Sequence, residues 1–350
     1  MRALSRAIVG SNPDLIVSGD DLATQHLHAL HSQSAQYGAQ GAKVRDLIEH
    51  SLGSPEGYAI AYARAPFLHL AEEAGIRVPA TVSIVAAHDV ENWASEHGFP
   101  AVMKADGMTG GEGVRLVRSL EVAQRARREL RASPSFARAA KRALLDQDWT
   151  LVRPSLLRKR RDVSIQSFVR GHEATSAIVC REGVLLASLH FEVLQKTSPH
   201  GPATVLRLIQ NSEMQSAAEK IAKRLCLSGF HGLDFMLEEE TGRPYLIELN
   251  PRATQVGHLT LGARRDLPAA LYAAMTGEPI RPAAKLTENQ IICLFPGECL
   301  RDPESEYLRT GYHDLPFGEP ELARACLRKK GISASSAERW ILAASVMPSA

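Results

Sequence analysis

The alternation of apolar and polar positions predicts a short first unit at the N-terminus. PDLIVSGDD (residues 13–21) is typical of a short apolar strand that ends in a Gly-Asp-Asp turn. Apolar positions at Leu22, Leu27 and Leu30 then follow a helical period. Only about a dozen residues precede the expected strand, whereas α/β domains normally contain several strands. We therefore expect a truncated first domain that ends near residue 63.

The next region predicts a helix, an extended segment and a hairpin. Ala65-Pro66 is a typical helix start, and Gly75 closes that helix before the extended segment IRVPATVSI (residues 76–84). FPAVMKADGMTGGEGVRLVRS (residues 99–119) then reads as two apolar strands joined by a glycine-rich loop, and a charged helix follows to about residue 131.

Strands dominate the pattern between residues 163 and 250. Four segments have strand character, namely VSIQSFV, TSAIVC, VLLASLHFEV and GLDFMLEEETGRPYLIEL. A helix over about residues 212–225 separates the last segment from the others. After about residue 281 the pattern is mixed, and beyond Gly331 it specifies little.

Composition and charge narrow the class of protein. With 45% apolar and 23% charged residues, the chain is typical of a soluble globular protein with a large core. Lys and Arg number 41 against 39 Asp and Glu, so no net field favours nucleic acid or a membrane surface. We therefore expect small-molecule partners.

The cysteines and the hydropathy indicate a cytoplasmic protein. The 5 cysteines lie far apart and form no Cys-x-x-Cys pair, which argues against a disulfide framework or a zinc knuckle. No apolar run approaches the roughly 20 residues that span a bilayer, and no signal-peptide pattern is present at the N-terminus.

A second hairpin carries two opposed acids. LDFMLEEETGRPYLIELNPR (residues 233–252) predicts a turn centred on Thr241, with Gly242 in the left-handed conformation. In that register Asp234 lies opposite Glu248, and like charges in such a pair are unfavourable unless something neutralises them.

These acids have two interpretations. Asn250 projects on the same face as Glu248, and three oxygen-bearing groups of this kind suit Mg²⁺ or Mn²⁺. Alternatively, both acids lie on a solvated face with counterions. Leu246, which the strand period places on the same face, argues against a fully exposed face.

Lys104 stands near the end of an apolar strand, ahead of the glycine-rich loop. The order fits neither a Walker loop, whose lysine follows the glycines, nor a dinucleotide fingerprint. Glycines allow backbone N–H groups to approach phosphate oxygens, and the lysine adds a positive charge. The alternative is an ordinary hairpin loop with a solvated lysine.

Taken together, these elements resemble the ATP-grasp superfamily, in particular its carbamoyl phosphate synthetase and biotin carboxylase branch. The resemblance runs from about residue 13 to 280, and the order of the motifs is more specific than any one of them. It implies an α/β (α+β) fold in which two lobes hold ATP between them. The implied divisions are a shortened Rossmann-like domain (1–63), an ATP-grasp domain (64–280, lobes about 64–165 and 166–280) and a C-terminal extension (281–350).

The resemblance also implies the nucleotide-binding residues, which are Arg64, Lys104, Thr109, Gly110, Gly111, Gly113, Gln166, Ser167, Phe168, Val169 and Glu173. The two cations would contact the phosphates under the glycine flap. The stretch from residue 166 to 169 would contact adenine, chiefly through its backbone, and Glu173 would bind the ribose hydroxyls.

The same resemblance implies the metal ligands and the catalytic residues. Asp234, Glu248 and Asn250 would bind Mg²⁺ or Mn²⁺, while Arg252 and Lys104 would offset charge on the transferred phosphoryl group.

Two departures from the family pattern affect the expected chemistry. Gln166 stands where these relatives often have glutamate. LQKTSPHGPATV (residues 194–205) has Gln195 and Lys196 but lacks the acidic pair of biotin carboxylases, which disfavours carboxylation. His200 falls near a phosphate contact of some relatives, although a solvated loop histidine is the commoner case.

The leading hypothesis is an ADP-forming ligase that activates a carboxylate as an acyl phosphate and joins it to an amine. The alternative is a nucleotide-binding protein that senses or regulates without turnover, motivated by the short first domain and Gln166. A homodimer is the assembly that the resemblance favours, and the sequence does not name the carboxylate or the amine.

Overall fold

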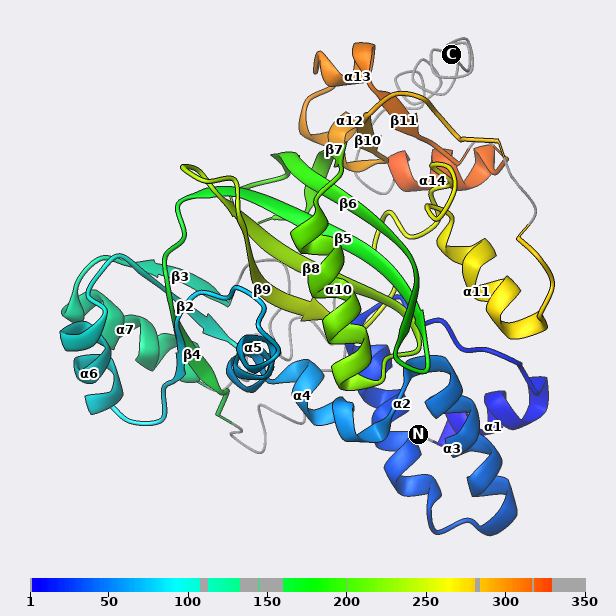
Figure 1. The fold of residues 1–350 in the computed structure, drawn as a ribbon, viewed down its shortest axis with the longest axis horizontal. Helices are drawn as coiled ribbons and strands as arrows, with labels where there is room; N and C mark the ends of the chain where they lie inside the picture. Colours follow the sequence, from blue (N-terminus) through cyan, green and yellow to red (C-terminus); the bar gives the residue numbers. More distant parts are fainter. Residues whose placement is uncertain are drawn as a thin grey trace.

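The computed structural model describes residues 2–107, 113–132, 144, 160–199, 201–280, 284–316 and 318–328. Its elements form an N-terminal group of helices, a four-stranded sheet and a larger seven-stranded sheet (Figure 1). No helix in these ranges combines the length and apolar character needed to cross a membrane.

The N-terminal region is helical, so the strand predicted at residues 13–18 is wrong. Its elements are α1 (Arg2–Ser11), α2 (Asp21–Ser34), α3 (Gly38–Leu52), η1 (Pro55–Gly57) and α4 (Tyr58–Tyr62). The predicted helix through Leu27 and Leu30 is confirmed, and the Asp20 side chain caps its N-terminus by accepting from the Ala23 N–H.

In the part of the chain that the structure describes, the expected strand has no neighbouring strand to pair with. The Ile16 N–H instead bonds the Ser51 hydroxyl on α3. The apolar positions are buried between helices rather than in a sheet: Leu27 and Leu30 pack with Val44 in one buried cluster. Residues 2–63 therefore form a helical unit, and the expected Rossmann-like domain is not found there.

The smaller sheet has the strand order β1-β4-β2-β3, and all its pairings are antiparallel. Its elements follow α5 (Arg64–Glu73), the predicted helix, and are β1 (Thr81–Ser83), α6 (His88–Glu96), β2 (Ala101–Ala105), β3 (Val114–Val117), α7 (Leu120–Arg131) and β4 (Val163–Ser167). One face is apolar and packs on α6 and α7 around Trp93 and Met103. Strand alternation turns Lys104, between two buried apolar neighbours of β2, to the opposite face.

The larger sheet has the order β11-β10-β7-β6-β5-β8-β9. Its elements are β5 (Gly171–Arg181), β6 (Val184–Lys196), β7 (Ala203–Ile209), α10 (Ser212–Leu225), β8 (Gly229–Glu238), β9 (Pro244–Asn250), α11 (Leu267–Thr276), β10 (Ile291–Leu294), α12 (Gly297–Arg301), α13 (Tyr307–Thr310), β11 (Tyr312–Asp314) and α14 (Pro320–Arg328). Because β10 pairs with β7, the segment predicted as a C-terminal extension completes this sheet.

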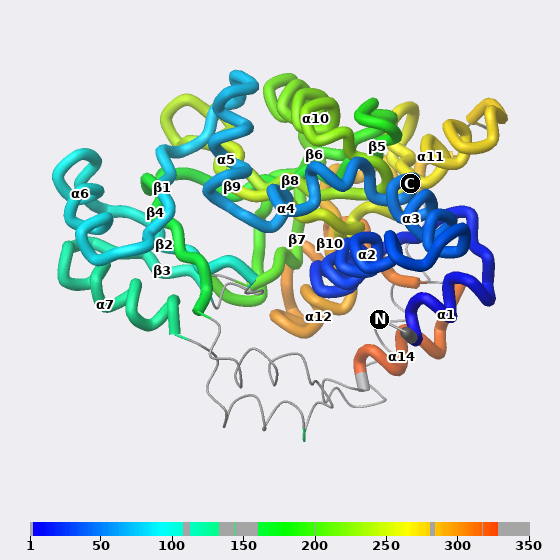
Figure 2. Tube along the Cα trace, turned by 90° about the horizontal axis from the view of Figure 1, so that it is seen from below, coloured from blue at the N-terminus to red at the C-terminus, as the bar shows by residue number. Residues whose placement is uncertain are grey.

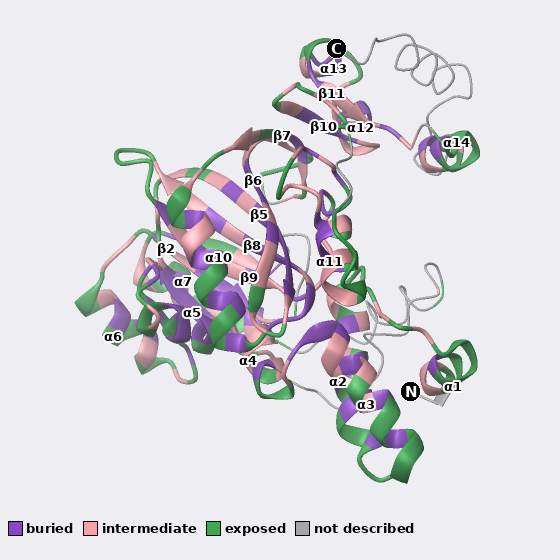
Figure 3. Cartoon of the chain, turned by 45° about the vertical axis from the view of Figure 1, so that its right-hand side comes forward, coloured by how far each residue is buried: buried purple, intermediate pink, exposed green. Residues whose placement is uncertain are grey.

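Helices cover the two faces of the larger sheet differently. On one face, α5 and α10 lie on the same side and bury a cluster that includes Phe67, Ile221 and Phe235 (Figure 2). On the other face, α11 packs over Ala177 and Val179 of β5. Buried residues concentrate in the sheets and the packed helix faces, whereas the N-terminal end of α3 and both ends of α6 are exposed (Figure 3).

The predicted β8–β9 hairpin is confirmed, with Asp234 directly opposite Glu248 and Gly242 at a φ of +67°. The register shifts between Asp234 and Phe235, so that Phe235 pairs with Leu246. This bulge overturns one expectation: Leu246 is buried in the α5–α10 cluster, on the face opposite Asp234.

Candidate functional site

Lys104 is a buried cation on the face of the smaller sheet that points away from α6 and α7. Its side chain lies at the end of β2, opposite Ser164 of β4, and the residue is only 6% exposed. Among the described residues, no hydrogen bond or ion pair joins the ammonium group. Burial lowers the pKa of Lys104 to about 8, and the Arg64 charge adds to this, while Glu248, Asp234 and Glu173 oppose it. Such a group favours an anionic ligand.

Asp234, Glu248 and the Asn250 amide form a cluster on the larger sheet, called the acidic group here. The two carboxylate oxygens of Asp234 accept hydrogen bonds from the Thr175 hydroxyl and the Asn250 amide, each at 2.8 Å. Burial and the charge of Glu248 raise the pKa of Asp234 to about 6, against the opposing effect of these hydrogen bonds and of Arg252. The three predicted metal ligands therefore converge.

Arg64 joins the two sheets. Its guanidinium forms an ion pair with Glu248 of β9 at 2.6 Å and with Asp106, just after β2, at 3.1 Å. The arginine side chain is only 10% exposed. The predicted phosphate-binding cation thus lies in the site, where it neutralises one of the predicted metal ligands.

Arg252 lies just beyond the end of β9 and meets the N-terminal helices. Its Nε donates to Asp21 at 3.2 Å, and one terminal nitrogen lies 3.4 Å from the Asn250 amide oxygen. Burial raises the pKa of Asp21, and the Arg252 charge opposes that rise. The guanidinium is therefore held beside the acidic group.

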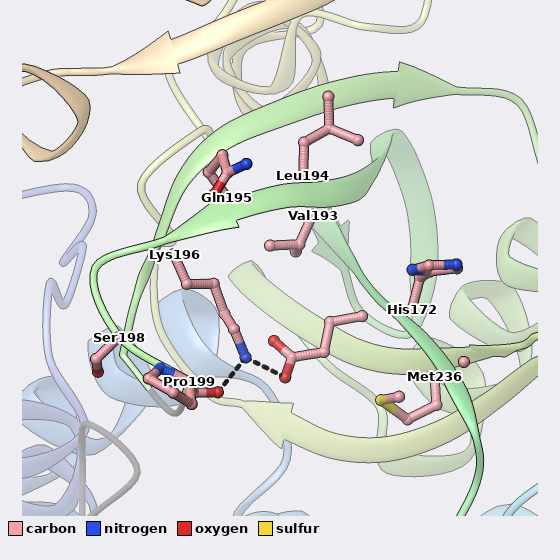
Figure 4. A pocket seen from close by; sticks show the side chains of 10 residues that line it. His172, Val193, Leu194, Gln195, Lys196, Ser198, Pro199 and Met236 are labelled. Atoms are coloured by element: carbon pink, nitrogen blue, oxygen red, sulfur yellow. Dashed lines mark hydrogen bonds and ion pairs between the residues drawn. The ribbon is translucent and has the colours of Figure 1, made fainter. Parts of the chain in front are cut away.

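A cavity of about 430 Å³ opens beside Glu173 and ends near Met236 of β8. Lys196 borders it and donates to Glu173 and to the Pro199 carbonyl, each at 2.5 Å (Figure 4). Glu173, Thr175 and Asp234 occupy one face of the sheet, because the strand register pairs Thr175 with Asp234 and Glu173 with Met236. Glu173 therefore lines the cavity, and Thr175 and Asp234 lie beyond it on the same face of the sheet.

The predicted adenine-reading residues connect the two sheets. Gln166 and Ser167 end β4, and residues 168–170 lead into β5. The Gln166 amide nitrogen donates to the Thr81 hydroxyl at 3.1 Å, which holds this side chain against β1. Phe168 is 42% exposed and Val169 is half-buried.

Most of the predicted glycine flap lies outside the described residues. Thr109, Gly110 and Gly111 lie outside the described residues, as does His200. Gly113 is described, and its carbonyl accepts from the Ala105 N–H at the start of the returning strand.

Four polar residues of the site were missed from the sequence: Asp21, Asp106, Ser164 and Thr175. Strand period alone could have indicated Thr175, two positions after Glu173, and Asp106, two after Lys104. Ser164 is buried with no partner for its hydroxyl among the described residues. Nothing local indicates that Asp21 meets Arg252, 231 positions away.

The donor set fits a hard divalent cation. Two carboxylates face each other across the hairpin, and the Asn250 amide nitrogen bonds Asp234. The amide oxygen accepts one long hydrogen bond from Arg252, at 3.4 Å, and keeps a second lone pair for a ligand. Burial first, and then the charge of Glu248, raise the pKa of Asp234, and a bound cation would offset both effects. No group of three or more His, Cys, Asp or Glu side chains placed to hold a metal occurs in the described ranges, so the amide is needed to complete the set.

Comparison with known proteins gives a family match over much of the chain. The family described as "Carbamoyl-phosphate synthase L chain, ATP binding domain" matches residues 63–262. Acetyl-CoA carboxylase 2 of Oryza sativa subsp. japonica is 27% identical over 189 residues, which are 52% of this chain and 7% of that protein. The carbamoyl phosphate synthase large chain of Saccharolobus solfataricus is 24% identical over 204 residues, 56% of this chain and 17% of that protein.

Solved structures resemble the fold over a longer span. The biotin carboxylase domain of 2-oxoglutarate carboxylase from Hydrogenobacter thermophilus, solved as a dimer with MgADP, ADP and bicarbonate, superposes with a TM-score of 0.56 at 16% identity. The superposition covers 80% of this chain and 57% of that one. Biotin carboxylase from Campylobacter jejuni gives a TM-score of 0.51 at 15% identity, covering 80% and 55%. The chain thus spans a small part of these curated relatives and little more than half of these solved chains.

Proposed function

Because this chain belongs to the carbamoyl-phosphate synthase L chain ATP-binding-domain family, and so to the ATP-grasp superfamily, we propose that it is a Mg-ATP-dependent ligase. It activates a small carboxylic acid as an acyl phosphate and joins it to an amine with release of ADP. The family resemblance drawn from the sequence is confirmed, while the substrates and the residue roles belong to the proposal.

One observation carries the proposal: Lys104 is buried, has no partner among the described residues, and lies near enough to Asp234 and Glu248 to feel their charge. An unpaired buried charge is strongly unfavourable, so a protein retains it where a ligand completes the pairing. A polyphosphate with a divalent cation would neutralise both sides of the site. Its oxygens would pair with Lys104, and the cation would pair with the carboxylates of Asp234 and Glu248.

The nucleotide has a matching place. The cavity of about 430 Å³ beside Glu173 lies within the range typical of small-molecule sites. We place the ribose at Glu173 and the adenine toward residues 166–169, where Gln166, Ser167, Phe168 and Val169 lie between the sheets. The phosphates then extend toward Arg64 and Lys104, with the glycine loop that includes Gly113 above them. For Glu173 to bind ribose, its ion pair with Lys196 must open or be shared.

Asp234, Glu248 and Asn250 would hold the magnesium ion, or manganese in its place. When bound there, the cation would offset the negative charge of the phosphates. Thr175 and Arg64 keep two of these ligands oriented through hydrogen bonds to their carboxylates.

The proposed reaction needs no covalent enzyme nucleophile. A carboxylate oxygen of the substrate attacks the γ-phosphorus, and the bond to the ADP oxygen breaks. The amine then attacks the acyl carbon, phosphate leaves and the nitrogen loses a proton. Lys104 and Arg252 offset the negative charge that develops on the transferred phosphoryl group.

Location and assembly complete the proposal. We place the protein in the cytoplasm, in keeping with its five free cysteines. We also propose a homodimer, since the Hydrogenobacter domain was solved as a dimer.

The test is ADP release by the purified chain with Mg-ATP and a panel of carboxylic acids, using hydroxylamine to trap the acyl phosphate as a hydroxamate. We expect ADP and hydroxamate to form together, and only with particular acids. ADP formation with bicarbonate alone would contradict the ligase proposal. Tight Mg-ATP binding without turnover on any acid would instead favour the non-catalytic nucleotide-binding protein.

A further inference from the structure

The N-terminal helices contact the part of the site that follows β9. Three residues around the start of α2 take part. The Ser18 carbonyl accepts from the Ala253 N–H at 3.0 Å, and the Thr24 hydroxyl donates to the Pro251 carbonyl at 3.0 Å. Asp21 lies between these two in sequence and pairs with Arg252. Each residue from 251 to 253 is therefore bonded to the N-terminal region.

The contact between α2 and residues 251–253 is largely buried. Ser18 and Thr24 are both buried and joined by a 2.7 Å hydrogen bond. One turn further along α2, His28 stacks on Tyr58 with ring centroids 3.5 Å apart. A buried side chain held by several hydrogen bonds resists displacement, so α2 fixes where Asp21 stands.

Asp21 constrains a side chain that would otherwise be flexible. Arg252 has four rotatable bonds and lies at a strand end, where backbone pairing does not orient it. Asp21 accepts from Nε, while the terminal nitrogens reach the Ala253 carbonyl and the Asn250 amide oxygen. Nε is thereby occupied by the carboxylate, and a terminal nitrogen is brought beside the acidic group.

We propose that Asp21 is the positioning residue for Arg252, and that the helices before residue 63 are thereby a working part of the ATP site. This inference rests on the proposed function, in which Arg252 contacts the transferred phosphoryl group. Asp21 itself does not touch the nucleotide. Its contribution is confined to the terminal phosphate, because Arg252 stands by Asn250 and not by the Glu173 cavity.

Because the effect of Asp21 is limited to the terminal phosphate, it can be measured as a difference in affinity between nucleotides with two and three phosphates. A general loss of stability would weaken the binding of both nucleotides equally. The full-length protein is titrated calorimetrically with Mg-ADP and with Mg-AMP-PNP, an ATP analogue that keeps the third phosphate. The dissociation constant of Mg-ADP divided by that of Mg-AMP-PNP reports the contribution of that phosphate. We expect Asp21→Asn to reduce the ratio by about 5-fold, the low end of measured coupling between sites, with ADP affinity nearly unchanged.

Three variants make the comparison specific. Asp14→Asn removes an exposed acid from the same segment and is expected to keep the wild-type ratio. Asp21→Glu retains the charge and is expected to keep most of the ratio; if it falls as low as in the Asn variant, the proposed hold on Arg252 is wrong. Arg252→Gln is expected to lower the ratio at least as far as Asp21→Asn.

Other outcomes overturn the inference in distinguishable ways. Equal weakening of both nucleotides in Asp21→Asn would mean a purely structural role. An unchanged ratio in Arg252→Gln would mean that Arg252 does not contact the terminal phosphate, although nucleotide binding stands. If the wild-type protein bound neither nucleotide, the proposed function itself would fail.

Discussion

The two sheets contribute different charges to the site. Lys104 on the smaller sheet is buried and has no partner among the described residues, whereas the carboxylates of Asp234 and Glu248 on the larger sheet are both paired. Asp234 accepts from Thr175 and Asn250, and Glu248 pairs with Arg64. The acids are therefore paired by the fold itself, while Lys104 has no bonded counter-charge among the described residues. This difference supports the proposed arrangement, in which phosphate oxygens lie against Lys104 and the cation lies against the hairpin.

The strongest way to break this comparison is to remove both acids. Asp234→Asn combined with Glu248→Gln is expected to lower the affinity for Mg-ATP by roughly 1000-fold, since two charge-assisted contacts are lost at once. Calorimetric titration with and without magnesium measures this. Glu240→Gln, at the exposed turn of the same hairpin, is the control and should bind normally. Unchanged magnesium dependence in the double variant would rule out the metal site.

The next effect concerns the stability of the nucleotide-free protein. Because burial lowers the pKa of Lys104 to about 8, its charge destabilises the folded state at neutral pH, by about 3 kcal/mol from that displacement. Lys104→Met, similar in volume, is expected to raise the free energy of unfolding by that order.

The sign of the pH dependence follows from the same displacement. The folded protein releases the Lys104 proton before the unfolded chain does, so wild-type stability should rise between about pH 8 and 10.5. The advantage of Lys104→Met should shrink over that range, as denaturant titrations at several pH values would measure. A constant difference between the two proteins would contradict the unpaired-lysine interpretation.

The same variant should act in the opposite direction on binding. Lys104→Met is expected to weaken Mg-ATP binding by about 10- to 100-fold, the usual value of a hydrogen bond to a charged group. Lys43→Met, which removes an exposed ammonium from α3, should leave both stability and affinity near wild type. Loss of stability together with loss of binding in Lys104→Met would mean that the lysine has a structural partner.

The smallest effect sharpens the description of the acidic group. Thr175→Val removes the hydroxyl that donates to Asp234 and keeps the shape of the side chain. We expect roughly 10-fold weaker magnesium binding, as for other residues that orient metal ligands, and a further rise in the Asp234 pKa. Magnesium titrations at pH 6 and pH 8 would measure both. Equal magnesium affinity in the two proteins at both pH values would show that the hydroxyl does not orient Asp234.

Local sequence was sufficient for several parts of the site. The period of two in β9 placed Glu248 and Asn250 together, and the position of Gly242 indicated the turn that sets Asp234 opposite Glu248. Local pattern failed where a partner was needed. Residues 13–18 are apolar enough for a strand, yet the described ranges contain no adjacent strand to pair with them. The pattern also could not reveal the bulge that turns Leu246 into the core.

The sequence by itself indicated the family fold and most of the charged side chains that the proposed site brings together, because strand period, turn residues and motif order are local properties. Tertiary structure alone decided the long-range pairs: Arg64 with Glu248 between the sheets, and Asp21 with Arg252 across most of the chain. Such pairs arise when separate elements pack, and their geometry depends on the burial of apolar faces elsewhere. The charges were therefore readable in advance, whereas their partners and the loss of solvent around Lys104 were not.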